Sequence, residues 1–263
     1  MTIHRVRVRY GYTYPQPIAD LRHRLVVVPP DRHGGQVVRE YALEVRCDGG
    51  PVSVSQERDV FGNRVHRILA SRVERSIEFE ASYRVEQGQP VRRPWDVRRY
   101  LCPTALTAPD ARLREAARAL QAASSPMTAA RTLAHRAHEW VASALDWQLG
   151  ATTYHTPASV ALELGKGVCQ DYAHILLVVL RLLGIPARYA SGHLPGSGPP
   201  HAWVEALVGP REVLGFDPSH ARLTGPEYLT VAVGRDFSDV TPTSGVFSGP
   251  PGGVLTYSKL ASA

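Results

Sequence analysis

The chain has 263 residues, of which 44% are hydrophobic and 21% charged, and its formal net charge is +6. These values are typical of a globular protein that is long enough for two domains. No stretch approaches the roughly 20 apolar residues of a membrane span, which argues against a membrane protein.

The first ten residues alternate charged and apolar side chains and lack the continuous apolar region of a secretory signal. They predict a first strand and a cytoplasmic protein. The basic charge comes from arginines scattered along the chain, and the densest cluster, 92–99, is interrupted by Asp96. No recognition motif accompanies this cluster, so we expect a solvated surface rather than a nucleic-acid partner.

Three cysteines, Cys47, Cys102 and Cys169, form no C-x-x-C pair. An odd number without this spacing argues against a disulfide framework and against a structural zinc site. The chain also lacks an H-E-x-x-H motif, and His155 and His174 have no carboxylate or cysteine at ligand spacing. We therefore expect neither a metal nor another cofactor.

Residues 1–95 show the period of strands. Alternating segments at 3–10, 37–45 and 68–85 are separated by turn residues and carry no helical period. This pattern predicts an N-terminal domain, 1–95, built as an antiparallel β-sandwich.

After the Pro-containing segment 87–94 the pattern becomes helical, and a last helix from about 169 to 183 is apolar nearly all round. Three strands then follow, which predicts an α+β core at 96–225 with a buried helix on an antiparallel sheet. A segment rich in Gly, Pro, Ser and Thr, 226–263, is expected to wrap the surface. The helices and strands expected in the core lie at 110–123, from Ser125-Pro126 to Trp147, from Thr156-Pro157 to Gly165, and at 169–183, 187–191, 201–208 and 213–217.

Cys169 occupies a position that favours reactivity. It lies in a glycine-punctuated loop that opens the predicted buried helix. Unpaired N–H groups and the helix dipole stabilise a thiolate there, and the N–H groups of Cys169 and Gln170 can hold an oxyanion. The glycines at 165 and 167 are expected to let an acyl substrate approach the backbone.

His201 opens a predicted strand, and Asp217 ends the next one, after a turn at Gly209-Pro210. A hairpin about this turn places Asp217 roughly opposite Trp203, within side-chain reach of His201. A carboxylate there can hold the imidazole tautomer that takes a proton from a thiol. Cysteine, histidine and aspartate therefore form a candidate triad.

Three sequence blocks, 167–174, 201–205 and 215–219, resemble those of bacterial transglutaminase-like proteins, with 32 residues from Cys169 to His201 and 16 to Asp217. The superfamily includes transglutaminases, peptide N-glycanases and papain-like proteases. Further pieces at 25–30, 59–63 and 232–240 resemble the β-rich domain and the C-terminal segment of one bacterial subgroup. The resemblance implies a papain-like core with Cys169, His201 and Asp217 as the triad.

The resemblance leaves the side-chain donor of the oxyanion hole open. Papain-like proteases place a glutamine some six residues before the cysteine, where this chain has Glu163. Trp147 and Tyr154 are substitutes for this role, although core packing is the favoured interpretation for both. Trp203 either lines the acyl channel or packs in the core.

The activity implied is thiol-dependent acyl transfer on an amide bond of a peptide or a glutamine-type side chain. Hydrolysis by water is preferred over cross-linking to a lysine amine, since no amine channel is evident. A different class of function, a catalytically inactive binding or scaffold module, is less favoured because the triad is intact.

Overall fold

The first strand follows from simple alternation. In β1 (Thr2–Thr13) the side chains of Val6, Val8 and Tyr10 are buried, and the arginines between them are exposed. Successive side chains of a strand point to opposite faces, so the apolar set forms one side of a core.

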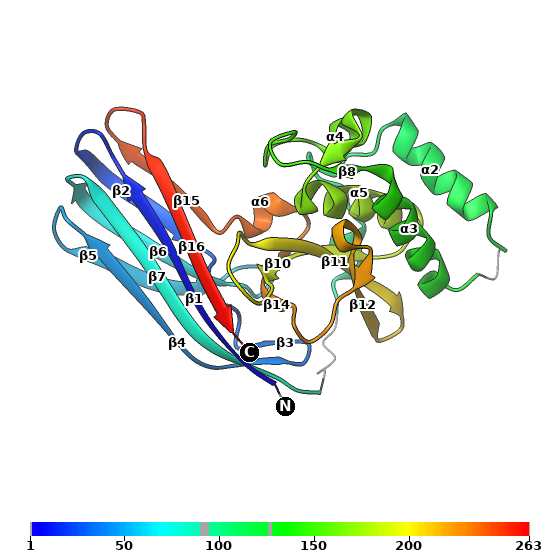
Figure 1. Ribbon diagram of the computed structural model, residues 1–263, viewed down its shortest axis with the longest axis horizontal. Coiled ribbons are helices and arrows are strands. Elements are labelled where there is room, and N and C mark those ends of the chain that lie inside the picture. Colours follow the sequence, from blue (N-terminus) through cyan, green and yellow to red (C-terminus); the bar gives the residue numbers. More distant parts are fainter. Residues whose placement is uncertain (1, 90–94, 126–127, 263) are drawn as a thin grey trace.

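The computed structural model describes residues 2–89, 95–125 and 128–262, arranged as in Figure 1.

Two antiparallel sheets make up the first part of the protein, which contains the first seven strands of the chain and the last two. One has the order β16 (Val254–Ser262), β1, β7 (Ser76–Gln87), β4 (Gln36–Cys47) and β3 (Arg32–His33). The other has the order β15 (Thr243–Ser248), β2 (Ile18–Leu25), β6 (Arg64–Val73) and β5 (Val52–Arg58).

These sheets share one apolar core. Val8 of β1 and Phe79 of β7 pack in the same buried cluster as Leu21 of β2 and Ile68 of β6. Side chains from the inner faces of two sheets thus interdigitate, which is the packing of a β-sandwich. The predicted sandwich is confirmed.

The second part of the protein is an antiparallel sheet covered by helices, seen on the right of Figure 1. The sheet has the order β13 (Arg222–Leu223), β12 (Glu212–Asp217), β11 (His201–Gly209), β10 (Ala187–His193) and β14 (Leu229–Gly234). The helices are α1 (Val97–Leu101), α2 (Ala111–Ala122), α3 (Ala130–Ala144), α4 (Ala158–Leu164), α5 (Cys169–Leu182) and α6 (Phe237–Val240).

Helix α5 is the centre of this domain. It packs on β10 and β11 and is surrounded by α2, α3 and α4. From Gln170 to Arg181 its residues are buried, as the apolar composition of this segment predicts. The α+β core with a buried helix on an antiparallel sheet is confirmed. Within the described residues, no helix has the length and apolar content needed to cross a membrane.

The helix expected to reach Trp147 is shorter than predicted. Helix α3 ends at Ala144, and Trp147 instead lies in β8 (Asp146–Trp147), which pairs in parallel with β9 (Lys166–Gly167). The predicted start at Ser125-Pro126 falls partly outside the described residues, and α3 begins at Ala130.

The C-terminal segment does not wrap the surface as expected. Its first strand, β14, is buried throughout and belongs to the core sheet. Strand β15 then pairs with β2 and β16 pairs with β1, so the chain returns to the sandwich (Figure 1, orange and red beside blue). The segment forms ladders because β1 and β2 each offer an edge with unpaired backbone groups. The domain boundary at residue 95 remains a prediction.

The outer edge of β14 is covered by two amide side chains from the sandwich. Gln36 donates from Nε2 to the carbonyl of Thr230 over 2.7 Å and accepts from its N–H over 2.9 Å. Asn63 does the same for Val233, at 2.7 Å and 2.8 Å. These amides satisfy backbone groups that an edge strand would otherwise leave unpaired, and so they dock the two domains.

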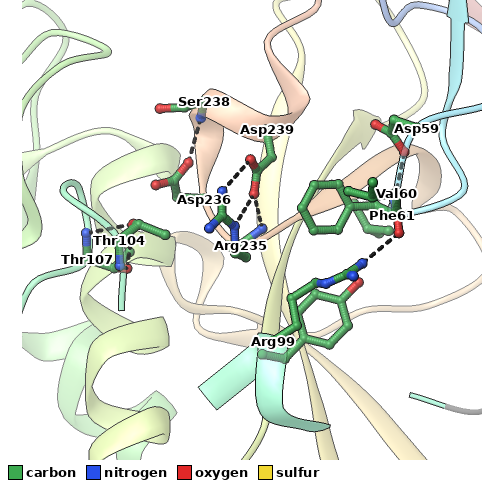
Figure 2. Close-up of polar contacts among 12 residues, drawn as sticks. Asp59, Val60, Phe61, Arg99, Thr104, Thr107, Arg235, Asp236, Ser238 and Asp239 are labelled. Carbon is green, nitrogen blue, oxygen red and sulfur yellow. Dashed lines mark hydrogen bonds and ion pairs between the residues drawn. The ribbon is translucent and has the colours of Figure 1, made fainter. Parts of the chain in front are cut away.

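The loop before Asn63 adds further contacts between the domains. Asp59 accepts from the backbone N–H groups of Phe61 and Asn63, which shapes the turn. Arg99 then reaches across from α1 to the carbonyl of Val60 over 2.6 Å (Figure 2). In the same view Arg235 pairs with Asp239, which holds the segment that follows β14.

Replacing Asn63 with alanine is expected to lower the free energy of unfolding by roughly 2–3 kcal/mol, since two buried backbone groups lose their partners. Urea unfolding measures this loss. Arg118→Ala is the control, because among the residues that the structure describes Arg118 pairs with Glu115 on α2, and both side chains are exposed. Equal stability of the Asn63 variant and the control would contradict the docking role.

Candidate active site

The turn that carries Cys169 is tightly built. Helix α4 ends at Gly165, whose φ of 62° lies in the left-handed region that glycine tolerates. A Cβ on Gly167 would come within 2.7 Å of the Asp171 side chain. Cys169 is the first residue of α5, so its N–H and that of Gln170 have no partner within the helix.

The buried side chain of Asp171 stabilises this turn by accepting hydrogen bonds. Its Oδ2 accepts from the N–H of Val168 over 2.8 Å and from the hydroxyl of Thr152 over 2.6 Å. Burial raises the pKa of Asp171, although these hydrogen bonds oppose the shift. The structure therefore gives Gly165 and Gly167 roles in the turn itself, where the sequence had suggested substrate approach.

His201 and Asp217 meet as the hairpin predicts. The ladder pairs Val204 of β11 with Phe216 of β12, which places Asp217 beside Trp203 and diagonal to His201. His201 donates from Nε2 to Oδ2 of Asp217 over 2.7 Å. The ring's other nitrogen, Nδ1, is then left free of Asp217, and Cys169 is close enough to act together with Asp217 in raising the pKa of His201. The three predicted triad residues are thus brought together.

Asp217 has no exposed surface and is held by donors on both oxygens. Oδ2 accepts from His201, from Nδ1 of His220 over 2.7 Å and from the hydroxyl of Tyr228 over 2.6 Å. Oδ1 accepts from the hydroxyl of Ser219 over 2.8 Å and from the N–H of His220 over 3.2 Å. A carboxylate with this many donors has little freedom to rotate.

These contacts set the charges of the site. Burial alone would raise the pKa of Asp217, but hydrogen bonds from His201, Tyr228 and Ser219 hold it well below its usual range. Burial likewise acts to lower the pKa of His201, yet Asp217 and Cys169 outweigh it and raise that pKa to about 9. The arrangement therefore favours an imidazolium beside an ionised carboxylate, which suits a thiolate as its other neighbour.

The additional predicted site residues are placed differently from one another. Gln170 is the second residue of α5 and is largely buried. Trp203 is 1% exposed and packs with Tyr228, Ala190 and Val233, so it belongs to the core beneath His201.

Trp147 and Tyr154, by contrast, are each 60% exposed, which corrects the interpretation that favoured core packing. The loop between them is hydrogen-bonded at two points to the turn that carries Cys169. The N–H of Gln148 donates to the carbonyl of Gly167 over 2.9 Å, and Thr152 donates to Asp171. These two hydrogen bonds, to residues beyond α4, hold the loop next to the turn that carries Cys169.

One group of side chains offers three potential metal-ligand atoms. Those of His201, Asp217 and His220 lie within 4.8 Å of one another. However, both nitrogens are 2.7 Å from Oδ2 of Asp217, whereas ligands of a tetrahedral zinc at 2.0–2.1 Å stand roughly 3.3 Å apart. The geometry is that of hydrogen bonds, and it would have to open to admit an ion.

Tyr228 and His220 were missed by sequence reasoning. His220 comes directly after the block 215–219, which was the available signal for it. Tyr228 lies eleven residues beyond Asp217 in a segment assigned to the surface, and only the return of β14 brings it back.

Comparison with known proteins agrees with this architecture. The family model of the transglutaminase-like superfamily core matches residues 114–218, and that of the bacterial transglutaminase-like N-terminal region matches residues 4–86. Together they cover more than two thirds of the chain. The core match contains Cys169, His201 and Asp217.

An uncharacterized protein of Mycobacterium leprae is 40% identical over 123 residues, which span 43% of each chain. One from Mycobacterium tuberculosis H37Rv is 35% identical over 115 residues, 38% of this chain and 37% of its own. The matched region is thus less than half the length of these relatives. The crystal structure of a candidate cysteine protease from Cytophaga hutchinsonii shares the fold, with a TM-score of 0.80, 20% identity, and coverage of 100% of this chain and 91% of its own. The chain belongs to the transglutaminase-like superfamily, in the bacterial group whose members carry this β-rich N-terminal region.

Proposed function

We propose that this protein catalyses thiol-dependent acyl transfer on an amide bond of a peptide or protein, with hydrolysis as the main outcome. The observation that carries the proposal is the hydrogen bond from Nε2 of His201 to the buried carboxylate of Asp217, on a ring whose pKa is raised by both Asp217 and Cys169. A base held in one tautomer beside a thiol at a helix start is the arrangement that nucleophilic cysteine catalysis needs.

The proposed reaction proceeds in two steps. The Cys169 thiolate attacks the amide carbonyl, and the N–H groups of Cys169 and Gln170 stabilise the oxyanion. His201 then gives its proton to the leaving amine or ammonia, and a thioester forms. In the second step His201 takes a proton from water as the water attacks the thioester, which releases the acid and restores the thiol.

Cross-linking is the alternative outcome of the same thioester, with a lysine amine in place of water. A glutamine-containing peptide library, incubated with and without a primary amine and examined by mass spectrometry, separates the two. We expect cleaved or deamidated peptides in both incubations. Amine incorporation that replaces these products would instead assign the protein as a transglutaminase.

An inactive binding module is the second class of function, and thiol reactivity distinguishes it. At about pH 6.5, below the usual thiol pKa of about 8.5, iodoacetamide is expected to modify Cys169 at least tenfold faster than Cys102. Cys102 is the more exposed thiol of the two, so exposure alone predicts the opposite order. Peptide mapping measures the labelling of each cysteine. Faster labelling of Cys102 than of Cys169 would support the interpretation as an inactive binding module.

The partner in this proposal is a peptide or protein substrate, and no nucleic acid or membrane is part of it. A cytoplasmic location remains a prediction from the sequence.

A further inference from the structure

We propose that His220 is a positioning residue of the triad, which holds the Asp217 carboxylate and the plane of the His201 ring so that Nδ1 of His201 faces Cys169. The inference rests on the proposed thiol-dependent function and adds a second imidazole to its site. Neither the sequence motifs nor the family matches single out this residue, since the core match ends at residue 218.

The contacts of His220 are directed at the parts of the triad that must not move. Its Nδ1 donates to the same carboxylate oxygen that binds His201, over 2.7 Å, and its backbone N–H donates to the other oxygen. Its ring also lies nearly parallel to that of His201, with centroids 4.8 Å apart and planes inclined by 28°. One residue therefore restrains both the carboxylate and the imidazole.

Packing alone does not account for this position. The His220 side chain is 47% exposed, whereas the carboxylate that it contacts is fully buried. The residue ends a 3-10 turn, Pro218–His220, and Ala221 follows with a φ of 51°, a left-handed conformation that a residue with a Cβ seldom adopts. Arg222 then pairs with Asp217 in the β12–β13 ladder. The 3-10 turn before His220 and the ladder pairing after it therefore hold the backbone of this residue in place, with its ring stacked on that of His201.

Because a carboxylate only accepts hydrogen bonds, both rings must present an N–H to Asp217. This fixes the proton of His201 on Nε2 and that of His220 on Nδ1 in their neutral forms. With Nε2 held by Asp217, Nδ1 is the nitrogen of His201 that exchanges a proton with Cys169. Loss of His220 would leave Oδ2 with two donors, and the His201 ring would keep Trp203 but lose the nearer of its two stacked neighbours. The ring would then sample orientations in which Nδ1 misses the thiol.

The test compares His220→Ala with His220→Asn, whose side-chain N–H₂ can still donate to Asp217. The rate of Cys169 alkylation is measured from acidic to alkaline pH. We expect the plateau rate to fall about tenfold in His220→Ala, the size expected for losing one hydrogen bond to a charged group, and to recover most of this loss in His220→Asn. Melting temperatures should stay close to that of the natural chain, since the side chain is half exposed.

A second measurement does not depend on thiol reactivity. In the NMR spectrum of protein labelled with ¹⁵N-histidine, the Nε2–H proton of His201 should be protected from exchange in the natural chain and in His220→Asn, but not in His220→Ala. An unchanged Nε2–H signal and an unchanged plateau rate in His220→Ala would overturn the inference. If Cys169 is unreactive in the natural chain, the proposed function fails, and the NMR signal still decides the role of His220.

Discussion

Cys169→Ala is expected to abolish turnover and all labelling by acyl-directed electrophiles, because Cys169 is the thiol that acts on His201. His201→Ala keeps the thiol but removes its base, so acylation should slow by about four orders of magnitude. Asp217→Asn should slow turnover on the order of a thousandfold, since an amide group favours the wrong tautomer of His201. Steady-state kinetics on a cleaved peptide measure these losses.

The three substitutions should also be strongly non-additive, because the residues act as one unit. Cys169→Ala combined with His201→Ala should be no worse than Cys169→Ala alone. Cys102→Ala is the matched control and should keep full activity, since it removes an exposed thiol outside the triad. Full activity in Asp217→Asn would contradict the role given to Asp217.

Thermal unfolding should show different losses of stability for substitutions of Cys169 and of Asp217. Cys169 is only partly buried, so Cys169→Ala should unfold at nearly the natural temperature. Asp217 is fully buried and accepts five hydrogen bonds, and an amide group cannot accept them all. Asp217→Asn should therefore lose roughly 1–3 kcal/mol of stability. Collapse of the fold in Cys169→Ala would indicate a core cysteine instead of a nucleophile.

Acidification from pH 7 to about 5 is expected to lower the free energy of unfolding by several kcal/mol. Burial lowers the pKa of His23, His66 and His174 to about 4 and that of His193 to about 3. Since these folded values lie below an unfolded value of about 6.5, the unfolded chain binds protons first. The stability that these histidines contribute is present above about pH 6.5 and is lost as the pH falls towards 4.

The contribution of His201 to stability depends on pH in the opposite direction. Its pKa of about 9 in the folded protein exceeds the unfolded value, so its contribution is complete below about pH 6.5 and is lost as the pH rises through 9. It offsets part of the loss in acid and adds a loss in alkali. Urea unfolding at several pH values should therefore show greatest stability near neutral pH.

A histidine substitution tests the origin of the acid effect. His23→Gln removes one of these four buried imidazoles, so the dependence of stability on pH between 5 and 7 should become about one quarter weaker. His155→Gln is the control, because His155 is exposed, and it should leave the dependence unchanged. The same dependence in both variants would show that other groups cause the acid sensitivity.

The sequence by itself determined the parts of the fold that depend on local periodicity. Alternation in β1 predicted a strand with one buried face, and the apolar run of α5 predicted a helix buried on all sides. The pairing of His201 with Asp217 could also be predicted, because the turn between β11 and β12 is short. A short hairpin fixes its own register, and the observed pairing of Val204 with Phe216 places Asp217 where the sequence put it.

Contacts between segments far apart in the chain were decided only by the tertiary structure. The Gly- and Pro-rich C-terminal segment has little pattern of its own, yet β15 and β16 form strands because β2 and β1 offer them unpaired edges. Trp147 was assigned to a helix and to the core because aromatic residues are usually buried, but pairing with Gly167 holds it in a short exposed strand. Tyr228 donates a hydrogen bond to Asp217 only because β14, which follows it directly, returns to pair with β10. Long-range pairing of this kind depends on which edges and donors the rest of the fold leaves free, and local sequence does not carry that information.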